Sequence, residues 1–178
     1  MSRAISAILV AGALLVAGCG GEEESPSEAW AGDFCSAAAD WRSSIDEAIA
    51  QVGDPADLSF NSLRGAIDDG LAATEAFIDD VRALGPPETE AGQEAAGIVD
   101  SMTDDLEADV DELRSALETE TQSVPELLEK AGQASTLIGQ MAQQLQSSVQ
   151  ELEGLEPADE LRSALEGNED CEGARAGS

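Results

Sequence analysis

The chain has 178 residues but no histidine and no tyrosine, and it carries eight Lys and Arg residues against 38 Asp and Glu residues. Without histidine it cannot form Cys-His or Ser-His nucleophilic pairs, the Glu-x-x-His motif of di-iron bundles, or an ordinary zinc site. The single lysine, Lys130, lies in a predicted helix, so no glycine loop with a lysine is present to hold phosphate. These absences predict a protein that is not an enzyme and uses no cofactor.

The formal net charge is −30 at pH 7. Nucleic-acid affinity comes largely from Lys and Arg side chains that displace counterions, so we expect no nucleic-acid partner. The same surplus of carboxylates disfavours contact between the folded part and an anionic membrane surface. Attachment to a membrane would therefore need a separate anchor.

The N-terminus has the organisation of a secretory signal peptide, with Arg3 at its tip and apolar or small residues from 4 to 17. That stretch is shorter than the ~20 residues a transmembrane helix needs, so a membrane span is the weaker alternative. The run Leu15-Val16-Ala17-Gly18-Cys19 resembles a bacterial lipobox. The resemblance implies cleavage before Cys19 and a diacylglyceryl group on its sulfur. Two acyl chains suffice for stable anchoring.

We predict four parts: a signal peptide (1–18), the lipidated Cys19 with a flexible acidic linker (19–32), a helical domain (33–172) and a disordered tail (173–178). Loss of Arg3 with the signal peptide would change the net charge from −30 to −31. The linker is rich in Gly, Glu, Ser, Pro and Ala, and Trp30 is its one aromatic residue. We expect so polar a segment to form no buried core of its own. Fully extended, residues 20–32 would reach at most ~45 Å.

Four long segments place apolar residues at alternating steps of three and four, which predicts one apolar stripe on each of four helices. The predicted helices cover 34–52, 60–84, 95–117 and 123–152, with a short fifth helix at 158–166. Ser123 and Glu126 form a capping box at the fourth helix. Brief Pro and Gly connections predict an all-α, up-down-up-down four-helix bundle. Because the stripes are rich in alanine, we expect close helix spacing and little room for a large ligand.

One repeat is present: the octapeptide Asp111–Glu118 recurs letter for letter as Asp159–Glu166. Eight identical residues suggest a short duplication. Each copy has the pattern of a good amphipathic helix with two inward leucines, so we assign it no function.

Cys35 and Cys171 are the two thiols that remain once Cys19 is lipidated. The acidic residues on either side of Cys171 disfavour a thiolate and make it a poor nucleophile. In an up-down bundle the start of the first helix and the end of the fourth lie at the same pole, and the outer side of the membrane is oxidising. These points favour a Cys35–Cys171 disulfide over two free thiols.

Paired carboxylates recur along the helices, at Asp68-Asp69, Asp79-Asp80, Asp104-Asp105 and within Asp109–Glu112. They could serve as a general acid and base or as a calcium site, but neighbouring residues on a helix diverge. No Asp-x-Asp-x-Asp-Gly loop is present to enclose calcium. We therefore predict solvated helix faces with no catalytic and no metal-binding residue.

Three aromatic residues, Trp30, Phe34 and Trp41, are spaced for one helical face near the same pole. They could form a platform for a carbohydrate or a partner. Packing at the end of the bundle is the favoured interpretation, since large aromatic side chains supply much of the buried area of a core.

The layout resembles the small helical lipoproteins of high-GC Gram-positive bacteria. The shared features are Cys19, the Glu22–Glu24 run, Phe34-Cys35 and the late Cys171, in a chain with little lysine and much Ala, Gly, Asp and Glu. The resemblance implies a helical fold and a location at the outer face of the cell membrane. Such proteins mostly lack an assigned activity, so it transfers no functional residues.

Together these features predict a non-catalytic lipoprotein, anchored through Cys19, that binds or scaffolds an envelope protein. The alternative is a carrier of a small apolar ligand or lipid between helices, against which the Ala-rich stripes argue. A carboxylate hydrolase is a third class. It would need two inward acids facing each other, and the sequence pattern locates no such pair.

Overall fold

The computed structural model describes residues 25–52, 59–118, 124–156 and 158–175. These residues form six helices and no strand: α1 (Pro26–Val52), α2 (Phe60–Leu84), α3 (Gly92–Glu118), α4 (Val124–Glu153), α5 (Asp159–Gly167) and α6 (Glu169–Arg175). The predicted all-α class is confirmed.

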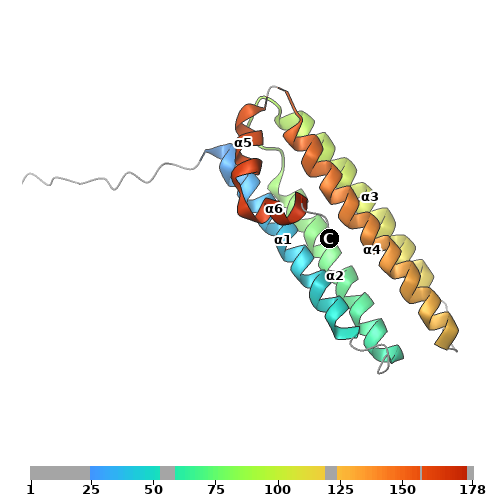
Figure 1. Cartoon of the computed structure of the whole chain (residues 1–178). Coiled ribbons are helices and arrows are strands. Elements are labelled where there is room, and N and C mark those ends of the chain that lie inside the picture. The colour runs from blue at the N-terminus through green and yellow to red at the C-terminus, as the bar shows by residue number, and fades with distance from the viewer. Residues whose placement is uncertain (1–24, 53–58, 119–123, 157, 176–178) are drawn as a thin grey trace, which may run out of the picture.

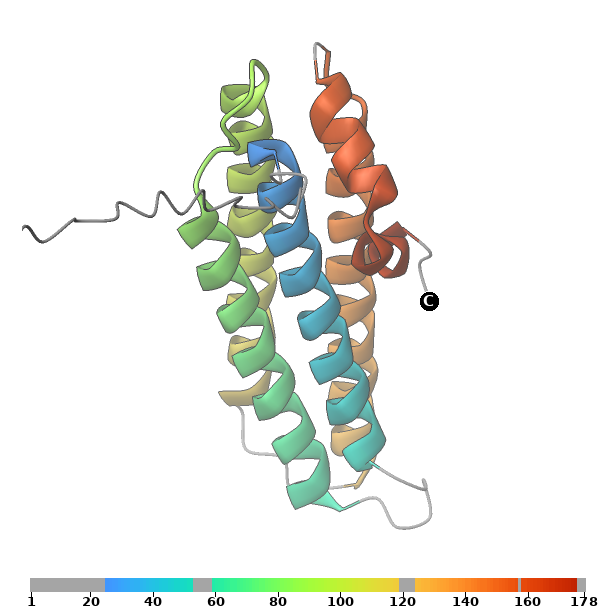
Figure 2. The same cartoon turned by 90° about the vertical axis from the view of Figure 1, so that its left-hand side faces the viewer.

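The four long helices run up, down, up and down as two hairpins, α1–α2 and α3–α4, joined by the contact of α2 with α3 (Figures 1 and 2). The fourth side of the bundle is different. No Cα atom of α1 lies within 8 Å of one of α4 in the described residues. Instead α5 and α6 contact both helices, near the pole where α1 begins and α4 ends.

The first helix begins at Pro26, seven residues before the boundary predicted at residue 33. The backbone N–H of Ser25 donates to Glu28 Oε2 at 2.7 Å, and the backbone N–H of Glu28 donates to Ser25 Oγ at 3.2 Å. This reciprocal pair is a capping box, and proline is favoured at the first helical position. The bond from Ser25 also lowers the pKa of Glu28.

Trp30 therefore belongs to the helical domain, and its placement in the linker was wrong. Its side chain is buried and stacks on Phe34, with ring centroids 5.3 Å apart. The indole N–H donates to the carbonyl oxygen of Gly85 at 2.9 Å. Because its N–H has a partner, this large ring can be buried where α1 begins and α2 ends. The predicted packing of the aromatic residues is confirmed.

At the other end of the chain, α5 agrees with the predicted fifth helix, but α6 was not predicted and includes residues 173–175 of the expected tail. Asn168 Oδ1 accepts the backbone N–H of Asp170 at 2.8 Å and of Cys171 at 3.4 Å, which caps α6. Residues 176–178, the linker before Ser25 and Ser123 of the predicted capping box lie outside the described residues.

The predicted stripes form the core. Along α1 the buried members recur at steps of three and four: Phe34, Ala38, Trp41, Ile45 and Ala48. Burial of each large apolar side chain contributes roughly 1.5–3 kcal/mol. A polar contact also joins the first hairpin, because Trp41 Nε1 donates to Thr74 Oγ1 at 3.0 Å.

Candidate functional site: a strap above an apolar groove

A disulfide joins Cys35 of α1 to Cys171 of α6, with their Cα atoms 4.8 Å apart. Both residues are fully buried. The structure thus has the pairing that the sequence favours. The two residues are 136 positions apart, so the bridge ties the C-terminal end of the chain to its first helix.

We call α5 and α6 together, residues 159–175, the strap. Its α5 helix buries Leu161 and Leu165 completely. Arg162 donates from Nε to the carbonyl oxygen of Glu153 at 2.6 Å, and from Nη2 to that of Leu155 at 3.2 Å. The last carbonyls of a helix have no partner within it, so this guanidinium completes the end of α4. The strap is held by covalent, apolar and polar contacts.

Farther from that pole, a groove lies among α1, α2 and α4. Its volume is about 320 Å³. Among the described residues, no charged side chain lines it and Ser135 supplies the one polar side chain. The lining residues are Ile45, Ala48, Ile49, Leu63, Ala66, Ile67, Gly70, Ala131, Ala134, Ser135 and Ile138. We call this the apolar groove.

Exposed aliphatic side chains adjoin the apolar groove. Among the described residues, Ile49 and Leu128 are the only exposed large hydrophobic residues, each 55% exposed. Ile49 lines the groove itself. Leu128 precedes Ala131 by three positions and Ser135 by seven on α4, so it lies on the same side of that helix. The two exposed aliphatic residues therefore lie in the groove lining and on the groove side of α4.

The groove qualifies the expectation of close helix spacing. Small residues do bring α1 and α2 together: a Cβ built on Gly70 would meet Ile45 Cδ1 at 3.6 Å. Helices α1 and α4 are not closely spaced, because the strap lies between them at one pole and contacts both. Alanine content predicts how close two paired helices lie, but it does not predict which helices pair.

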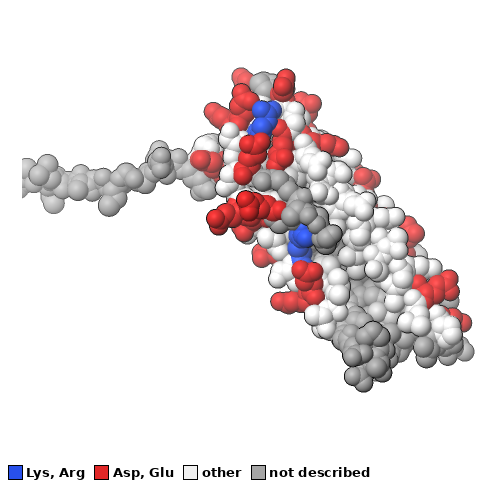
Figure 3. Space-filling model, in the orientation of Figure 1, with Lys and Arg blue, Asp and Glu red and all other residues white. Residues whose placement is uncertain are grey.

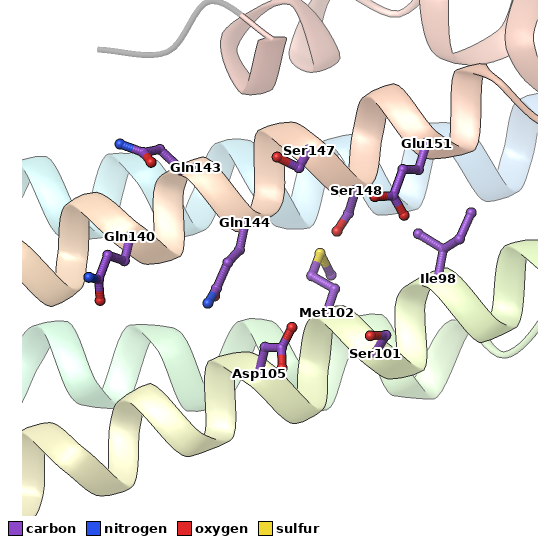
Figure 4. Close-up of a pocket in the computed structure, with 10 residues that line it drawn as sticks. All are labelled: Ile98, Ser101, Met102, Asp105, Gln140, Gln143, Gln144, Ser147, Ser148 and Glu151. Carbon is purple, nitrogen blue, oxygen red and sulfur yellow. The ribbon is translucent and has the colours of Figure 1, made fainter.

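A second, polar pocket of about 400 Å³ lies between α3 and α4. Figure 4 shows Asp105 opposite Gln144, and Met102 opposite Ser148. The two carboxylates that line the pocket, Asp105 and Glu151, are well separated along it. The structure therefore does not bring them face to face as the hydrolase hypothesis requires.

One turn along α3, Asp109 is half-buried against α4. Its Oδ2 atom and Oε1 of Gln144 are buried and have no hydrogen-bond partner. Burial raises the pKa of Asp109, and the nearby Glu112 and Asp105 carboxylates add to this effect, whereas a hydrogen bond from Gln144 opposes it. The buried Oδ2 atom without a hydrogen-bond partner is a local cost of packing α3 on α4.

The predicted acidic pairs Asp68-Asp69, Asp79-Asp80 and Asp104-Asp105 are exposed. Figure 3 shows acidic patches separated by uncharged surface. Within the described ranges, no group of three or more His, Cys, Asp and Glu residues is placed to hold a metal ion.

Some acidic residues join helices instead. Arg82 of α2 forms ion pairs with Asp104 and Glu107 of α3. Arg114 of α3 pairs with Glu75 of α2. The hydrogen bond between Arg82 and Glu107 lowers the pKa of the Glu107 carboxyl. Two arginines thus link α2 to α3 at the surface.

The predicted lipidation site, Cys19, lies outside the described residues. In the part of the chain that the structure covers, no helix combines the length and apolarity needed to cross a bilayer. The chain matches no protein-family model, and no curated protein or solved structure matches it either. Any function must therefore be argued from its own residues.

Proposed function

We propose that the protein is a lipid-anchored, non-catalytic binding module of the outer face of the cell membrane. The observation that carries the proposal is the apolar groove, whose described lining has no charged side chain and which lies beside exposed Ile49 and Leu128. Exposed apolar surface in a water-soluble fold marks a place where another molecule binds. The strap supports a binding role because it keeps that surface on a rigid frame.

The extracytoplasmic location rests on two features. The lipobox-like run before Cys19 provides an anchor, and the disulfide requires an oxidising compartment to form and persist. Both features agree with a domain displayed outside the membrane. Its partner would be another component of the envelope.

Photo-crosslinking in intact cells tests this function. A photoreactive amino acid replaces Ile49 at the groove, and the matched control carries it at Ala72, which is exposed on α2. We expect a defined adduct from position 49 and none of the same mass from position 72. Equal, non-specific adducts from both positions would contradict the proposal.

The anchor is tested separately. Cys19→Ala removes the acyl attachment and the cleavage signal together, so labelled fatty acid should disappear from the protein. Continued acylation of the variant would reject the role of Cys19. Because the groove does not include Cys19, this result leaves the binding proposal intact.

A second candidate function is the transport of a small apolar ligand. The volume and the uncharged lining of the groove favour it. Native mass spectrometry of the protein from cells that produce it separates the candidates: a bound small molecule supports a carrier, and a protein adduct at position 49 supports a scaffold.

A further inference from the structure

We propose that the apolar groove binds a single aliphatic chain of about a dozen carbons, whose polar end remains outside and is uncharged or cationic. This inference rests on the proposed binding function and names the ligand class. Three properties of the structure carry it: the chemistry of the lining, the size of the groove and the aliphatic residues that fill the space beside it.

The lining selects against polar ligands. Ten of the eleven described lining residues are Ile, Leu, Ala or Gly, and the exception, Ser135, is exposed. A polar group placed among Ile45, Ile67 and Ile138 would lose its water contacts and gain no hydrogen bond in return. An alkyl chain loses nothing polar there, and its removal from water is favourable.

The size decides between a chain and a helix. About 320 Å³ is at the lower end of the range for small-molecule sites. An engineered apolar cavity of about 150 Å³ holds benzene, with six carbons, so twice that volume takes about a dozen carbons. A helix with its side chains is about 10–12 Å across, so a single 5.4 Å turn encloses roughly 400 Å³, more than this groove holds.

The strap shows which chemical groups fit between α1 and α4. At its pole the space between these helices is occupied by the chain itself, through fully buried Leu161 and Leu165. The apolar groove lies farther along the same two helices, beyond the strap. An aliphatic ligand would continue a packing that the protein already makes with its own side chains.

The net charge of the protein determines which head group the ligand is expected to carry. With 38 acidic against eight basic residues, the protein repels an anionic head group at low ionic strength. Dodecanol and dodecyltrimethylammonium should therefore bind more tightly than dodecanoate. Salt screens such repulsion, so the difference should shrink between ~0.01 M and 1 M sodium chloride.

Methyl NMR tests the site on the whole chain in lipid nanodiscs, with isoleucine methyl groups labelled. Ile45, Ile49, Ile67 and Ile138 line the groove, and the remaining described isoleucines, Ile78 and Ile98, do not. Added dodecanol should shift the four groove signals, saturate at one molecule per chain, and leave the other two unchanged. Equal shifts of all six, or none, would overturn the proposal.

A pair of variants provides the matched control. Ile49→Asp places a carboxylate in the groove lining, and Ile49 is exposed enough for the fold to tolerate it. Ala50→Asp adds the same charge at the next, also exposed position of α1, which is outside the lining. We expect dodecanol affinity to fall about tenfold or more for I49D and less than about twofold for A50D, with both helical by circular dichroism. Equal effects would overturn the site.

The outcome is independent of the anchor and of any protein partner. Loss of dodecanol binding in I49D supports an aliphatic site even if cell crosslinking captures nothing. A protein adduct at position 49, together with no dodecanol binding, overturns the aliphatic ligand and keeps the binding module.

Discussion

The space between α1 and α4 has two halves that differ in what fills them. Near the pole where α1 begins, the strap fills it with two buried leucines, a disulfide and the hydrogen bonds of Arg162. Farther along the same helices no segment of the described chain covers the groove, and Ile49 is exposed. The same helix pair thus provides a closed core where the strap covers it and a groove beyond the end of the strap.

Removal of the disulfide should have the largest effect on the closed half. Chain entropy gives an upper value of roughly 5 kcal/mol for a loop of this length, since the bridge limits the unfolded state. A Cys35→Ala, Cys171→Ala double variant should therefore be less stable by about 2–5 kcal/mol in urea unfolding. Thiol titration of the unfolded, unreduced protein provides the control: two reactive thiols from these positions would show that the bridge does not form.

Truncation of one aliphatic residue in each half measures the contrast directly. Leu161 is fully buried, so Leu161→Ala should reduce the free energy of unfolding by about 2–5 kcal/mol. Ile49→Ala removes a side chain that is 55% exposed and should change it by less than about 0.5 kcal/mol. Chemical denaturation of both variants decides the comparison. Equal losses would mean that the groove is part of the closed core.

The repeated octapeptide allows a finer comparison, because its two arginines are in identical local sequences. Arg162 of the strap donates to two carbonyl oxygens at the end of α4, whereas Arg114 pairs with the carboxylate of Glu75. Arg162→Ala leaves those acceptors without a partner and should cost about 1–3 kcal/mol. Arg114→Ala breaks a surface ion pair and should cost about 0–1 kcal/mol. Both arginines also pair with the aspartate three positions earlier, Asp111 and Asp159, so urea unfolding at low and high salt should show a larger salt dependence for Arg114→Ala than for Arg162→Ala.

The smallest expected effect on stability is at Asp109, which lies where α3 contacts α4, away from the space between α1 and α4. Its pKa is raised in the folded protein, so the folded state binds a proton before the unfolded state as the pH falls. The ionised carboxylate therefore destabilises the fold at neutral pH, and this loss is recovered as the pH falls through the raised pKa. Asp109→Asn should be slightly more stable than the natural chain at pH 7, with the advantage vanishing near pH 4. A constant advantage across this range would contradict the shift.

Much of the helical framework could be predicted from the sequence. Apart from the start of α1, steps of three and four locate the long helices to within a few residues, and the position of Cys35 and Cys171 at one pole follows from an up-down bundle. The start of α1 was missed although the sequence contains its signal, since Ser25, Pro26 and Glu28 form a capping box at a proline. Glycine and glutamate before this point favoured a linker instead.

The groove could not be predicted because it depends on which helices become neighbours. Apolar periodicity shows which face of α1 is buried but not whether α4 or another element covers it. Helix α6 is only seven residues long and is held by Asn168 and a disulfide, so its existence depends on tertiary contacts. The duplicated octapeptide gives the same lesson: Leu113 and Leu161 are both buried, but their arginines bind different partners. The side chain of Leu117, also expected to face inward, lies outside the described part.

The early start of α1 limits how the proposed anchor would orient the protein. If the lipid is attached at Cys19, seven residues, 19–25, separate it from Pro26, and a chain of that length reaches at most about 25 Å. Ile45, the first residue of α1 in the groove, is about 29 Å along the helix axis from Pro26. A bundle standing upright on this linker would hold the groove farther from the lipid head groups than the linker alone can reach.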